Sequence, residues 1–394
     1  MAIIYNISIY LFLIAVRFYS FFNAKAKQWY IGRLDVFKKL SNSINNEKNI
    51  VWFHCASLGE FEQGSTIISS YKKKYPHHKI LLTFFSPSGY EICKDYKIAD
   101  WIFYLPADTN KNAKKFVNIV KPIKVFFIKY EFWFNYMKEL KKQNIALYSV
   151  STIFRNDQVF FRHKWFSKQL NSIDHFFVQD ENSKKLLNNI GLFNCTVSGD
   201  SRFDKVITNT KNKISIPLIE VFSKKKLTIV CGSTWPKDEK IIIQFIKKNP
   251  YYQYIIAPHE LYHLSKLKKQ TNALLFSKAN KKNISNYNVI IIDNLGMLSN
   301  LYQYGNIAYI GGGFSAGIHN ILEPAAFNLP IVFGPNHKKS IEASQLIKLH
   351  VAKSVSNFKQ LESAIDIFAS YNQSIALDYI HANIGSTKKI LANI

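Results

Sequence analysis

A glycine-rich stretch at residues 311–335, GGGFSAGIHNILEPAAFNLPIVFGP, has the composition of a phosphate-binding turn. It follows the apolar run NIAYI, which predicts a buried strand. Glycines directly after a strand let the backbone approach a ligand, and a helix that begins just beyond presents unpaired N–H groups. Glu323 cannot bind a phosphate, but it suits the hydroxyls of a ribose. The same glycines could serve a packing turn; their order with His319, Glu323 and Gly334 favours the phosphate site.

A second candidate site begins at HCASLGE, residues 54–60. A predicted strand ends near Ser57 and Gly59, and Glu60 follows where a helix should begin. Ligands bind at the carboxyl edge of a parallel sheet, and a carboxylate placed there can act as a general base. The alternative is that Glu60 only complements the dipole of the helix that it begins.

Two further strand ends carry polar groups. Ser233 and Thr234 follow the run LTIVCG and could offer hydroxyl and N–H groups to a phosphate, although an ordinary helix N-cap explains them equally well. Glu131 and Trp133, in KYEFWFNY, end another predicted strand.

The segment HELYH, residues 259–263, matches the HExxH pattern of zinc proteases. A zinc protease needs this pattern inside a helix and a third ligand further on. Here Pro258 precedes it directly and a predicted strand precedes the proline, which favours a strand-to-helix turn. The chain also lacks the DxD pair that holds a metal against a nucleotide-sugar diphosphate. We therefore expect a reaction without a metal or other cofactor.

Apolar strand-like runs alternate with amphipathic stretches along the chain, which predicts parallel βαβ units. The polar, lysine-rich residues 205–226 resemble a linker, and the alternation restarts after them. We therefore predict an α/β protein with two Rossmann-like domains facing a cleft. The expected strands are NIVWFHCAS, HKILLTFFS, WIFYL, KVFFIKY, IALYSVS and HFFVQD before the linker, and LTIVCGS, YYQYIIAP, VIIID, NIAYIGGG and PIVFGP after it. From Phe358 onward the pattern is helical.

The 394 residues suffice for two full cores, and the formal net charge of +26 favours polyanionic partners. Part of this charge is compositional drift, since Lys, Ile, Asn and Tyr are abundant throughout. Because the lysines are scattered and no recognition motif is present, we expect no nucleic-acid partner. Four isolated cysteines, without CxxC pairs, are typical of reduced, buried thiols in a cytosolic compartment.

Residues 2–22 form an apolar segment with no positive charge before Arg17. A secretory signal peptide carries its positive charges ahead of the apolar run, so this segment does not match one. Lys25, Lys27 and Arg33 follow it, which predicts that the bulk of the chain stays cytoplasmic. The segment is marginal for a full span, so a spanning anchor, an interfacial anchor and a buried first helix all stay open.

These motifs, in this order, resemble the bacterial lipid A Kdo (3-deoxy-D-manno-octulosonic acid) transferases, which have the GT-B fold. The resemblance covers nearly the whole chain. It is carried by the N-terminal segment and by HCASLGE (54–60), SPSGYE (86–91), YLPAD (104–108), EFWFN (131–135), VQDE (178–181), VSGDSRFD (197–204), GSTWPKDE (232–239), APHE (257–260) and GIHNILEPAAF (317–327).

The resemblance implies an inverting transfer of Kdo from CMP-Kdo to a phosphorylated, lipid IVA-like precursor of lipid A in lipopolysaccharide core biosynthesis. Glu60 takes the place of the family's general base, and Glu131 and Arg202 match residues thought to support the transition state. Ser57 and Gly59 then lie on the acceptor side. The expected contacts to CMP are Ser233, Thr234, Pro258, His259, Leu295, Gly296, Met297, Gly317, Ile318, His319, Asn320 and Glu323.

Some residues depart from the family pattern. The chain reads APHE where the family has PRHPE, and Met297 stands where many members have Glu. Lys129 replaces the first acid of an ETELW pattern, and the loop GFSAG lacks an Arg that often precedes the following motif. Arg202 replaces Lys, which keeps the charge with a different geometry. These changes affect single CMP contacts more than the whole resemblance.

The implied organisation is a membrane anchor at 1–23, an acceptor-binding domain at 24–204, a linker at 205–226 and a CMP-sugar-binding domain at 227–375. Residues 376–394 form a C-terminal helix expected to pack back on the first domain. The expected place is the cytoplasmic face of the inner membrane, where cationic side chains meet an anionic surface. Aromatic residues among the basic ones, such as Phe161 and Trp165, could touch lipid.

Two classes of alternative stay open. One is another GT-B enzyme: a different CMP-sugar transferase, a lipid-linked N-acetylglucosaminyltransferase or a UDP-sugar 2-epimerase. An epimerase would not need the membrane anchor, and a UDP-sugar enzyme would release UDP. The other is a basic, membrane-attached binding protein without catalysis, which would release no CMP from CMP-Kdo.

Overall fold

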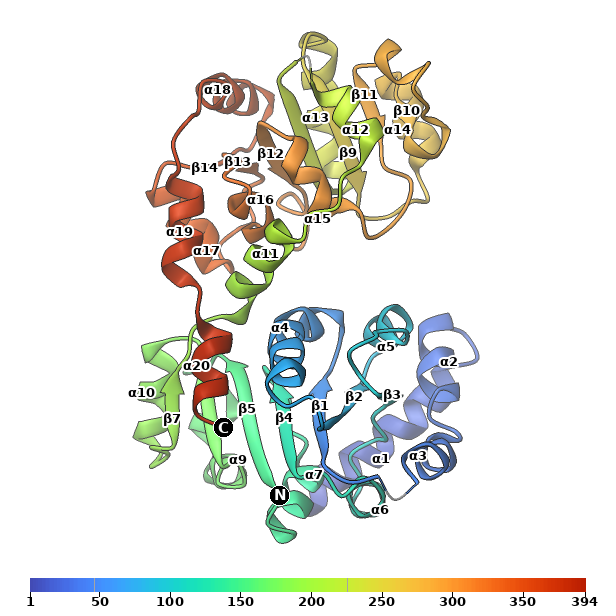
Figure 1. Cartoon of the computed structure of the whole chain (residues 1–394), viewed down its shortest axis with the longest axis vertical. Coiled ribbons are helices and arrows are strands. Elements are labelled where there is room, and N and C mark those ends of the chain that lie inside the picture. Colours follow the sequence, from blue (N-terminus) through green and yellow to red (C-terminus); the bar gives the residue numbers. More distant parts are fainter. Residues whose placement is uncertain (46, 225) are drawn as a thin grey trace. The chain divides into compact units, whose positions relative to one another are not determined.

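In a computed structural model that describes residues 1–45, 47–224 and 226–394, the chain forms two compact units (Figure 1). Unit 1 comprises Met1–Lys205 and Ile384–Ile394, and unit 2 comprises Val206–Asn383. Each unit is built on one 7-stranded sheet in which every neighbouring pair of strands is parallel. The predicted α/β class with two successive parallel sheets is therefore confirmed.

The sheet of unit 1 has the order β3-β2-β1-β4-β5-β6-β7. Successive side chains of β1 point to opposite faces, yet all six are buried, because helices cover both faces. The strands are β1 Ile50–Cys55, β2 Lys79–Phe84, β3 Trp101–Tyr104, β4 Lys124–Ile128, β5 Ala146–Thr152, β6 His175–Val178 and β7 Cys195–Val197.

Two apolar clusters make the core of unit 1, one on each face of the sheet. Trp52, Leu81 and Phe127 belong to one cluster, and Phe53 and Phe126 to the other. The helices of this unit are α1 Ala2–Tyr19, α2 Ala24–Ile31, α3 Val36–Ile44, α4 Leu58–Lys74, α5 Pro87–Cys93, α6 Asn110–Val120, α7 Phe134–Lys142, α8 Val159–Arg162, α9 Lys164–Leu170, α10 Glu181–Asn189 and α20 Ser386–Ala392.

Unit 2 repeats the architecture with the strand order β10-β11-β9-β8-β12-β13-β14. Its strands are β8 Thr228–Thr234, β9 Gln253–Pro258, β10 Leu274–Leu275, β11 Val289–Ile291, β12 Ile307–Ile310, β13 Ile331–Phe333 and β14 Ala352–Ser354. Its α-helices are α12 Pro217–Ser223, α13 Pro236–Lys248, α14 Leu264–Thr271, α15 Leu298–Leu301, α16 Leu322–Ala326, α17 Ile341–Lys348, α18 Phe358–Phe368 and α19 Ile375–Asn383. Short 3₁₀ turns lie at Phe276–Lys278, Ile284–Asn286 and Tyr302–Tyr304.

The borders of the units differ from the predicted ones. The predicted linker 205–226 contains most of α11 (Ser201–Lys211) and all of α12, and from Val206 onward it belongs to unit 2. The predicted C-terminal segment 376–394 is divided, since α19 lies in unit 2 and α20 in unit 1. Polar, lysine-rich composition indicated a linker, but the apolar side chains of Ile219 and Phe222 are buried and hold α12 in place.

Asp204 connects the point where the chain leaves unit 1 with the point where it returns to unit 1. Its carboxylate accepts hydrogen bonds from the backbone N–H groups of Gly385 and Thr387, both at 2.6 Å. The Ser386 hydroxyl donates to the Gly199 carbonyl, and Lys74 of α4 donates to the Leu391 carbonyl. The last helix is therefore fixed to the residues that directly precede unit 2.

Each sheet has one point where the strand order reverses. In unit 1 this point lies between β1 and β4, and in unit 2 between β8 and β12. Loops from the carboxyl ends of two such strands run to opposite faces, which leaves a crevice where ligands of open parallel sheets bind. The residues that follow these four strands are therefore the first to consider as site residues.

Candidate active site

Glu60 lies in the first turn of α4, directly after β1. Its Oε2 accepts from the backbone N–H of Ser57 at 3.1 Å and from the Ser57 hydroxyl. Its Oε1 lies 4.0 Å from Nζ of Lys129, which follows β4 and has a left-handed backbone with φ of 71°. Glu60 thus completes a capping box with Ser57. One carboxylate oxygen is held by the helix start, and the other is directed toward the turn after β4.

Glu131 ends a buried chain of hydrogen bonds that begins inside the sheet. Parallel pairing of β1 with β2 sets His54 opposite Thr83, and His54 Nδ1 lies 2.8 Å from the Thr83 hydroxyl. The Trp52 indole N–H donates to that hydroxyl at 2.7 Å. On the other side of the imidazole, His54 Nε2 lies 3.1 Å from Glu131 Oε2, to which Trp133 Nε1 donates at 2.6 Å.

The proton positions in this chain follow from its acceptors. With Glu131 ionised, the imidazole nitrogen that faces it must carry a proton. In a neutral His54, Nδ1 is then the acceptor. The Thr83 oxygen accepts the Trp52 N–H, and the Thr83 O–H donates to His54 Nδ1. Every group of the chain has a partner, although His54 and Thr83 are fully buried. The carboxylate of Glu131 is held in place from the sheet interior.

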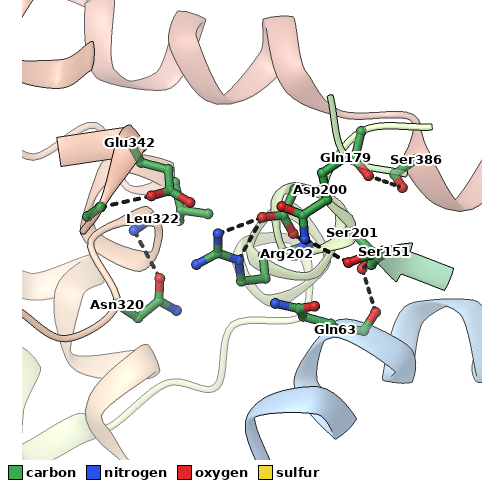
Figure 2. A network of polar contacts seen from close by, with 12 residues as sticks. Gln63, Ser151, Gln179, Asp200, Ser201, Arg202, Asn320, Leu322, Glu342 and Ser386 are labelled. Carbon is green, nitrogen blue, oxygen red and sulfur yellow. Dashed lines mark hydrogen bonds and ion pairs between the residues drawn. The ribbon is translucent and has the colours of Figure 1, made fainter. Parts of the chain in front are cut away.

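Arg202 follows β7 at the start of α11, on the same carboxyl edge. Its Nε and Nη2 donate to Asp200 Oδ2 at 2.8 and 2.6 Å, as Figure 2 shows. The adjacent Ser201 hydroxyl donates to the Gln63 carbonyl and lies 2.7 Å from the Ser151 hydroxyl, which ties this turn to α4 and β5.

Charge effects connect these residues of unit 1. Burial, followed by the charges of Glu60 and Glu131, raises the pKa of the Cys55 thiol at the end of β1. Both carboxylates are therefore close enough to the end of β1 to act on the same group. Burial raises the pKa of Tyr130, and the charges of Arg155 and Arg202 oppose this rise. The structure thus brings the three predicted catalytic residues to one edge of one sheet.

In unit 2, the glycine-rich turn lies where predicted, directly after β12, but its glycines mainly allow close backbone packing. A Cβ atom on Gly311 would lie 2.2 Å from the Ser233 carbonyl oxygen, and one on Gly313 would lie 2.5 Å from the Gly334 nitrogen. Gly312 and Gly317 have φ of 92° and 141°, which other residues rarely adopt. The packing alternative therefore accounts for Gly311 and Gly313.

The backbone N–H groups of this turn have protein acceptors. Those of Gly317, Ile318 and His319 donate to the carbonyls of Gly312, Asn336 and Gly311 at 3.1, 3.3 and 3.2 Å. Helix α16 begins only at Leu322 and has five residues, and the Asn320 side chain accepts from the Leu322 N–H. These N–H groups are therefore not the unpaired donors that the sequence predicted at the start of a helix.

Side chains at the same edge form a better-defined feature, which is a cluster of three rings. His259 stacks on both Trp235 and His319, with ring centroids 4.6 Å from each, while the Trp235 and His319 centroids are 6.4 Å apart and their rings nearly parallel. Trp235 Nε1–H donates to His319 Nε2 at 2.9 Å, so the remaining imidazole proton sits on Nδ1. Burial, followed by the His259 charge, lowers the pKa of His319 to about 4. His319 is thus neutral near pH 7 and can donate from Nδ1.

Two buried carboxylates at the start of α13 hold this edge together. Asp238 accepts from the N–H groups of Trp235 and Gly312 at 3.0 and 2.9 Å. Burial raises the pKa of Asp238. Glu239 accepts from the Thr234 hydroxyl at 3.0 Å and pairs with His263 Nε2 at 2.8 Å.

These contacts give one expected ligand residue a structural role of its own. Thr234 is fully buried with its hydroxyl on Glu239, so it supports the turn from inside. Its neighbour Ser233 is partly exposed, with φ of 52°. The residues of the HExxH pattern separate in the same way, because His263 pairs with Glu239 while His259 stacks on Trp235. Within residues 1–45, 47–224 and 226–394, no group of three or more His, Cys, Asp and Glu side chains could hold a metal ion.

The remaining predicted contacts lie on loops of the same edge. Pro258 ends β9 and is buried, and the exposed His259 follows it. Leu295, Gly296 and Met297 form the turn between β11 and α15, where Leu295 is 76% exposed and Gly296 has φ of 89°. Leu298 of α15 approaches the end of β8, since it would contact a Cβ atom on Gly232.

Glu323 is oriented by Asn320, whose Nδ2 donates to Glu323 Oε1 at 3.2 Å. Burial, followed by the Glu323 charge, raises the pKa of Tyr302, whose hydroxyl lies beside Gly232. The carboxylate therefore lies near the end of β8, at the point where the strand order of unit 2 reverses.

Comparison with known proteins agrees with this arrangement. Residues 31–205 match the family model described as 3-deoxy-D-manno-octulosonic-acid transferase (kdotransferase). Over these residues the chain is similar to the Kdo transferase family. The matched residues include all three predicted catalytic positions, Glu60, Glu131 and Arg202. The resemblance inferred from the sequence is therefore confirmed.

Several relatives with similarity over most of the chain carry the same name. The Kdo transferase of Rickettsia prowazekii is 27% identical over 381 residues, which cover 90% of this chain and 80% of that protein. A bifunctional glycosyltransferase/methyltransferase of Fusobacterium nucleatum is 26% identical over 366 residues. These cover 86% of this chain but only 56% of the Fusobacterium protein, so the chain spans about half of that relative.

Solved structures show the likeness of fold. The UDP-GlcNAc 2-epimerase of Neisseria meningitidis, bound to UDP-GlcNAc, superposes with a TM-score of 0.60 at 14% identity. The superposition covers 87% of this chain and 98% of the epimerase chain. Together with the two parallel sheets, it supports a GT-B-like architecture for this chain.

Several supporting residues escaped the sequence analysis. Trp235 and Asp238 were part of the quoted motif GSTWPKDE, and an acid three residues after a helix N-cap is a recognisable signal. Thr83 and Trp52 gave no such signal, because their roles depend on the pairing of β1 with β2.

Proposed function

We propose that this protein transfers Kdo from CMP-Kdo, with inversion, to a hydroxyl of a phosphorylated lipid A precursor, with Glu60 as general base. The observation that carries the proposal is the position of Glu60 in the first turn of α4, beside the strand-order reversal of a domain that matches the Kdo transferase family. A ligand crevice is expected at this point of a parallel sheet.

In the proposed step the acceptor hydroxyl gives its proton to Glu60 as its oxygen bonds to the anomeric carbon of Kdo. The bond from that carbon to the phosphate oxygen breaks, and CMP leaves. Glu60 Oε2 is bound by Ser57, so Oε1 is the oxygen that we assign to the proton. Glu131, held by His54 and Trp133, and the Arg202 cation support the charges that develop in the transition state.

For the donor we propose the carboxyl edge of unit 2. The Nδ1–H of His319 is a neutral donor suited to a phosphate oxygen, and Glu323 suits the ribose hydroxyls. Ser233, Pro258, His259 and the turns at 295–297 and 317–320 complete the expected CMP contacts. We propose that no metal takes part, so excess EDTA is expected to leave the rate unchanged. We also propose attachment to the cytoplasmic face of the inner membrane through α1, which has the length and apolar composition of an anchor.

The test is incubation of the purified full chain with CMP-Kdo and a tetraacyl lipid A precursor, followed by mass spectrometry of the lipid and detection of CMP. Loss of a general base lowers rates by about 10²- to 10⁴-fold, so Glu60→Gln is expected to fall in that range. Glu181→Gln is the matched control, because Glu181 is also a first-turn carboxylate of a helix in unit 1. Wild-type transfer by Glu60→Gln would refute the mechanism, and absence of CMP release by the wild type would refute the function.

A further inference from the structure

Helix α1 is 18 residues long with a mean hydropathy of 1.7, and among the described residues it is the one helix that could cross a membrane. At 1.5 Å per residue it is about 27 Å long, which barely matches a hydrocarbon core of about 30 Å. Crossing the bilayer would therefore need the whole helix to be free of the rest of the protein.

The helix is not free. Its half-buried residues are Tyr5, Asn6, Ile9, Leu13 and Val16, followed by Ser20 at the C-cap, and they lie on one face of the helix. This face is turned toward the rest of unit 1, and α1 packs beside α2, although no residue of α1 is fully buried. A helix that crossed the bilayer would lose these contacts.

Polar contacts fix this docked face near the N-terminus. The Tyr5 hydroxyl donates to Asp108 Oδ2 at 2.5 Å, and Asp108 is buried. The Asn135 side chain donates to the Asn6 side chain at 3.0 Å. If α1 crossed the membrane, these polar atoms of unit 1 would have to follow Tyr5 into the lipid, at a cost of several kcal/mol for each unsatisfied group.

Ring contacts continue the docking further along the helix. Phe12 packs edge-on against Trp29 of α2, with ring centroids 5.4 Å apart, and lies 6.2 Å from Phe85 at the end of β2. Arg33 covers the other side of Trp29 at 3.7 Å and donates to the carbonyls of Leu105 and Phe85. Figure 1 shows α1 beside α2 within unit 1.

The opposite face of α1 is apolar and exposed. It consists of Ile3, Ile7, Leu11, Ile14 and Phe18, which are 75%, 53%, 61%, 66% and 67% exposed. Phe21 and Phe22, just beyond the helix, are 79% and 74% exposed. A continuous apolar stripe of this kind on a soluble surface marks a binding face.

Charge decides what this stripe binds. Residues 1–34 contain no Asp or Glu, and Arg17, Lys25 and Lys27 are exposed. An apolar stripe beside basic side chains is the composition of a helix that lies in the headgroup region of an anionic bilayer. Phe161 and Trp165, which the sequence analysis expected to touch lipid, are less suited to this contact because they pack against the core of unit 1.

We infer that α1 lies in the plane of the membrane, docked on unit 1 along one face, and inserts Ile3, Ile7, Leu11, Ile14 and Phe18 into the lipid of the cytoplasmic leaflet. The protein is then attached to one leaflet and does not cross the bilayer. This inference depends on the proposed membrane attachment but not on the transfer reaction, and its tests need no enzymatic activity.

The first test locates the N-terminus. A short polar tag with one cysteine is fused ahead of Met1 in the full chain, and a membrane-impermeant maleimide is added to spheroplasts and to inverted inner-membrane vesicles. All four native cysteines are buried, which keeps the background low. We expect labelling in inverted vesicles only, as for the same tag fused after Ile394. Labelling of the N-terminal tag in intact spheroplasts would overturn the inference.

The second test measures which face meets lipid. Purified full chain is sedimented with vesicles of phosphatidylethanolamine and phosphatidylglycerol, and in parallel with pure phosphatidylcholine. Phe18→Glu is expected to weaken partition into the anionic vesicles at least about tenfold, because it buries a charge in place of a large apolar side chain. The control Phe193→Glu makes the same change at a residue that is 75% exposed elsewhere on unit 1, and it is expected to change partition less than about twofold.

Equal binding by the two variants would overturn the inference. So would a dimer of the wild type, seen by gel filtration, that Phe18→Glu converts to monomer without weakening vesicle binding, since a second copy of the chain would then cover the stripe. Loss of transfer activity with unchanged topology and vesicle binding would count against the proposed function alone.

Discussion

The buried chain Trp52–Thr83–His54–Glu131 makes a quantitative prediction for Thr83→Val. Valine has nearly the shape of threonine, so the change removes the hydroxyl and leaves the packing. Trp52 Nε1 then loses its 2.7 Å acceptor, and His54 Nδ1 loses its 2.8 Å donor. An unsatisfied buried polar group costs about 1–3 kcal/mol. His54 Nδ1 is an acceptor in this arrangement, so the Thr83 carbonyl oxygen 3.1 Å away cannot replace the lost donor.

Two groups lose their partner, so we expect Thr83→Val to lower the free energy of unfolding of unit 1 by about 2–6 kcal/mol. The matched control is Thr196→Val in β7, where the hydroxyl bonds to the half-buried His175 at 2.9 Å. Water can replace this partner, so a loss of under about 1 kcal/mol is expected.

The assay is urea unfolding of the full chain followed by tryptophan fluorescence. Five of the six tryptophans (Trp29, Trp52, Trp101, Trp133 and Trp165) lie in unit 1 and only Trp235 in unit 2, so the signal mainly reports the affected unit. A loss in Thr83→Val no larger than that in Thr196→Val would show that the buried chain does not stabilise the site. If Glu131 acts in the transition state as proposed, Thr83→Val should also lower kcat more than it raises KM.

Two further predictions concern unit 2. Because burial lowers the pKa of His319 to about 4, against about 6.5 when unfolded, its neutral form contributes stability that is fully present above pH 6.5 and is lost as the pH falls toward 4. Urea midpoints at pH 7 and pH 4.5 should therefore differ less in His319→Asn than in the wild type; an unchanged difference would contradict this. Gly313→Ala should destabilise unit 2 by about 1–3 kcal/mol, because the new Cβ meets the Gly334 backbone at 2.5 Å. In Gly59→Ala the nearest atom, Ser57 Oγ, is 3.7 Å away, so thermal unfolding should show neutrality or a gain of up to about 1 kcal/mol. Equal melting temperatures for the two alanine variants would contradict the packing role of Gly313.

The strands that the sequence predicted include all the inner strands and the edge strand β3. Runs such as IVWFHC and TIVCGST are almost wholly buried, and both are recognisable by their mainly apolar or β-branched composition. The sequence analysis missed β7, β10 and β14, which have only three, two and three residues and lie near or at the sheet edges. A strand with one neighbour needs less apolar surface, so its local pattern is weak.

The site shows a similar limit. Glu60, Glu131 and His319 were found because each lies in the segment between a recognisable strand and the end of the first turn of the next helix. The partners that orient them, such as Thr83 and Trp235, are ordinary strand or helix-start residues until pairing brings them near. The turn at 311–317 was read correctly as a tight backbone approach, but the group approached is Gly334 and the Ser233 carbonyl. Glycine content cannot distinguish a ligand from another stretch of chain.

The bonds from Asp204 to Gly385 and Thr387 have a consequence for how the molecule is made and can be divided. Residues 206–383 leave and re-enter unit 1 at neighbouring points, so unit 2 is an insertion into a domain whose last helix is translated after it. During synthesis on the ribosome, unit 1 therefore lacks α20 until unit 2 has been translated. A short glycine-serine bridge from Lys205 to Ile384 should therefore yield a closed, independently folding unit 1, whereas a simple truncation at Lys205 would leave the α20 groove beside α4 open.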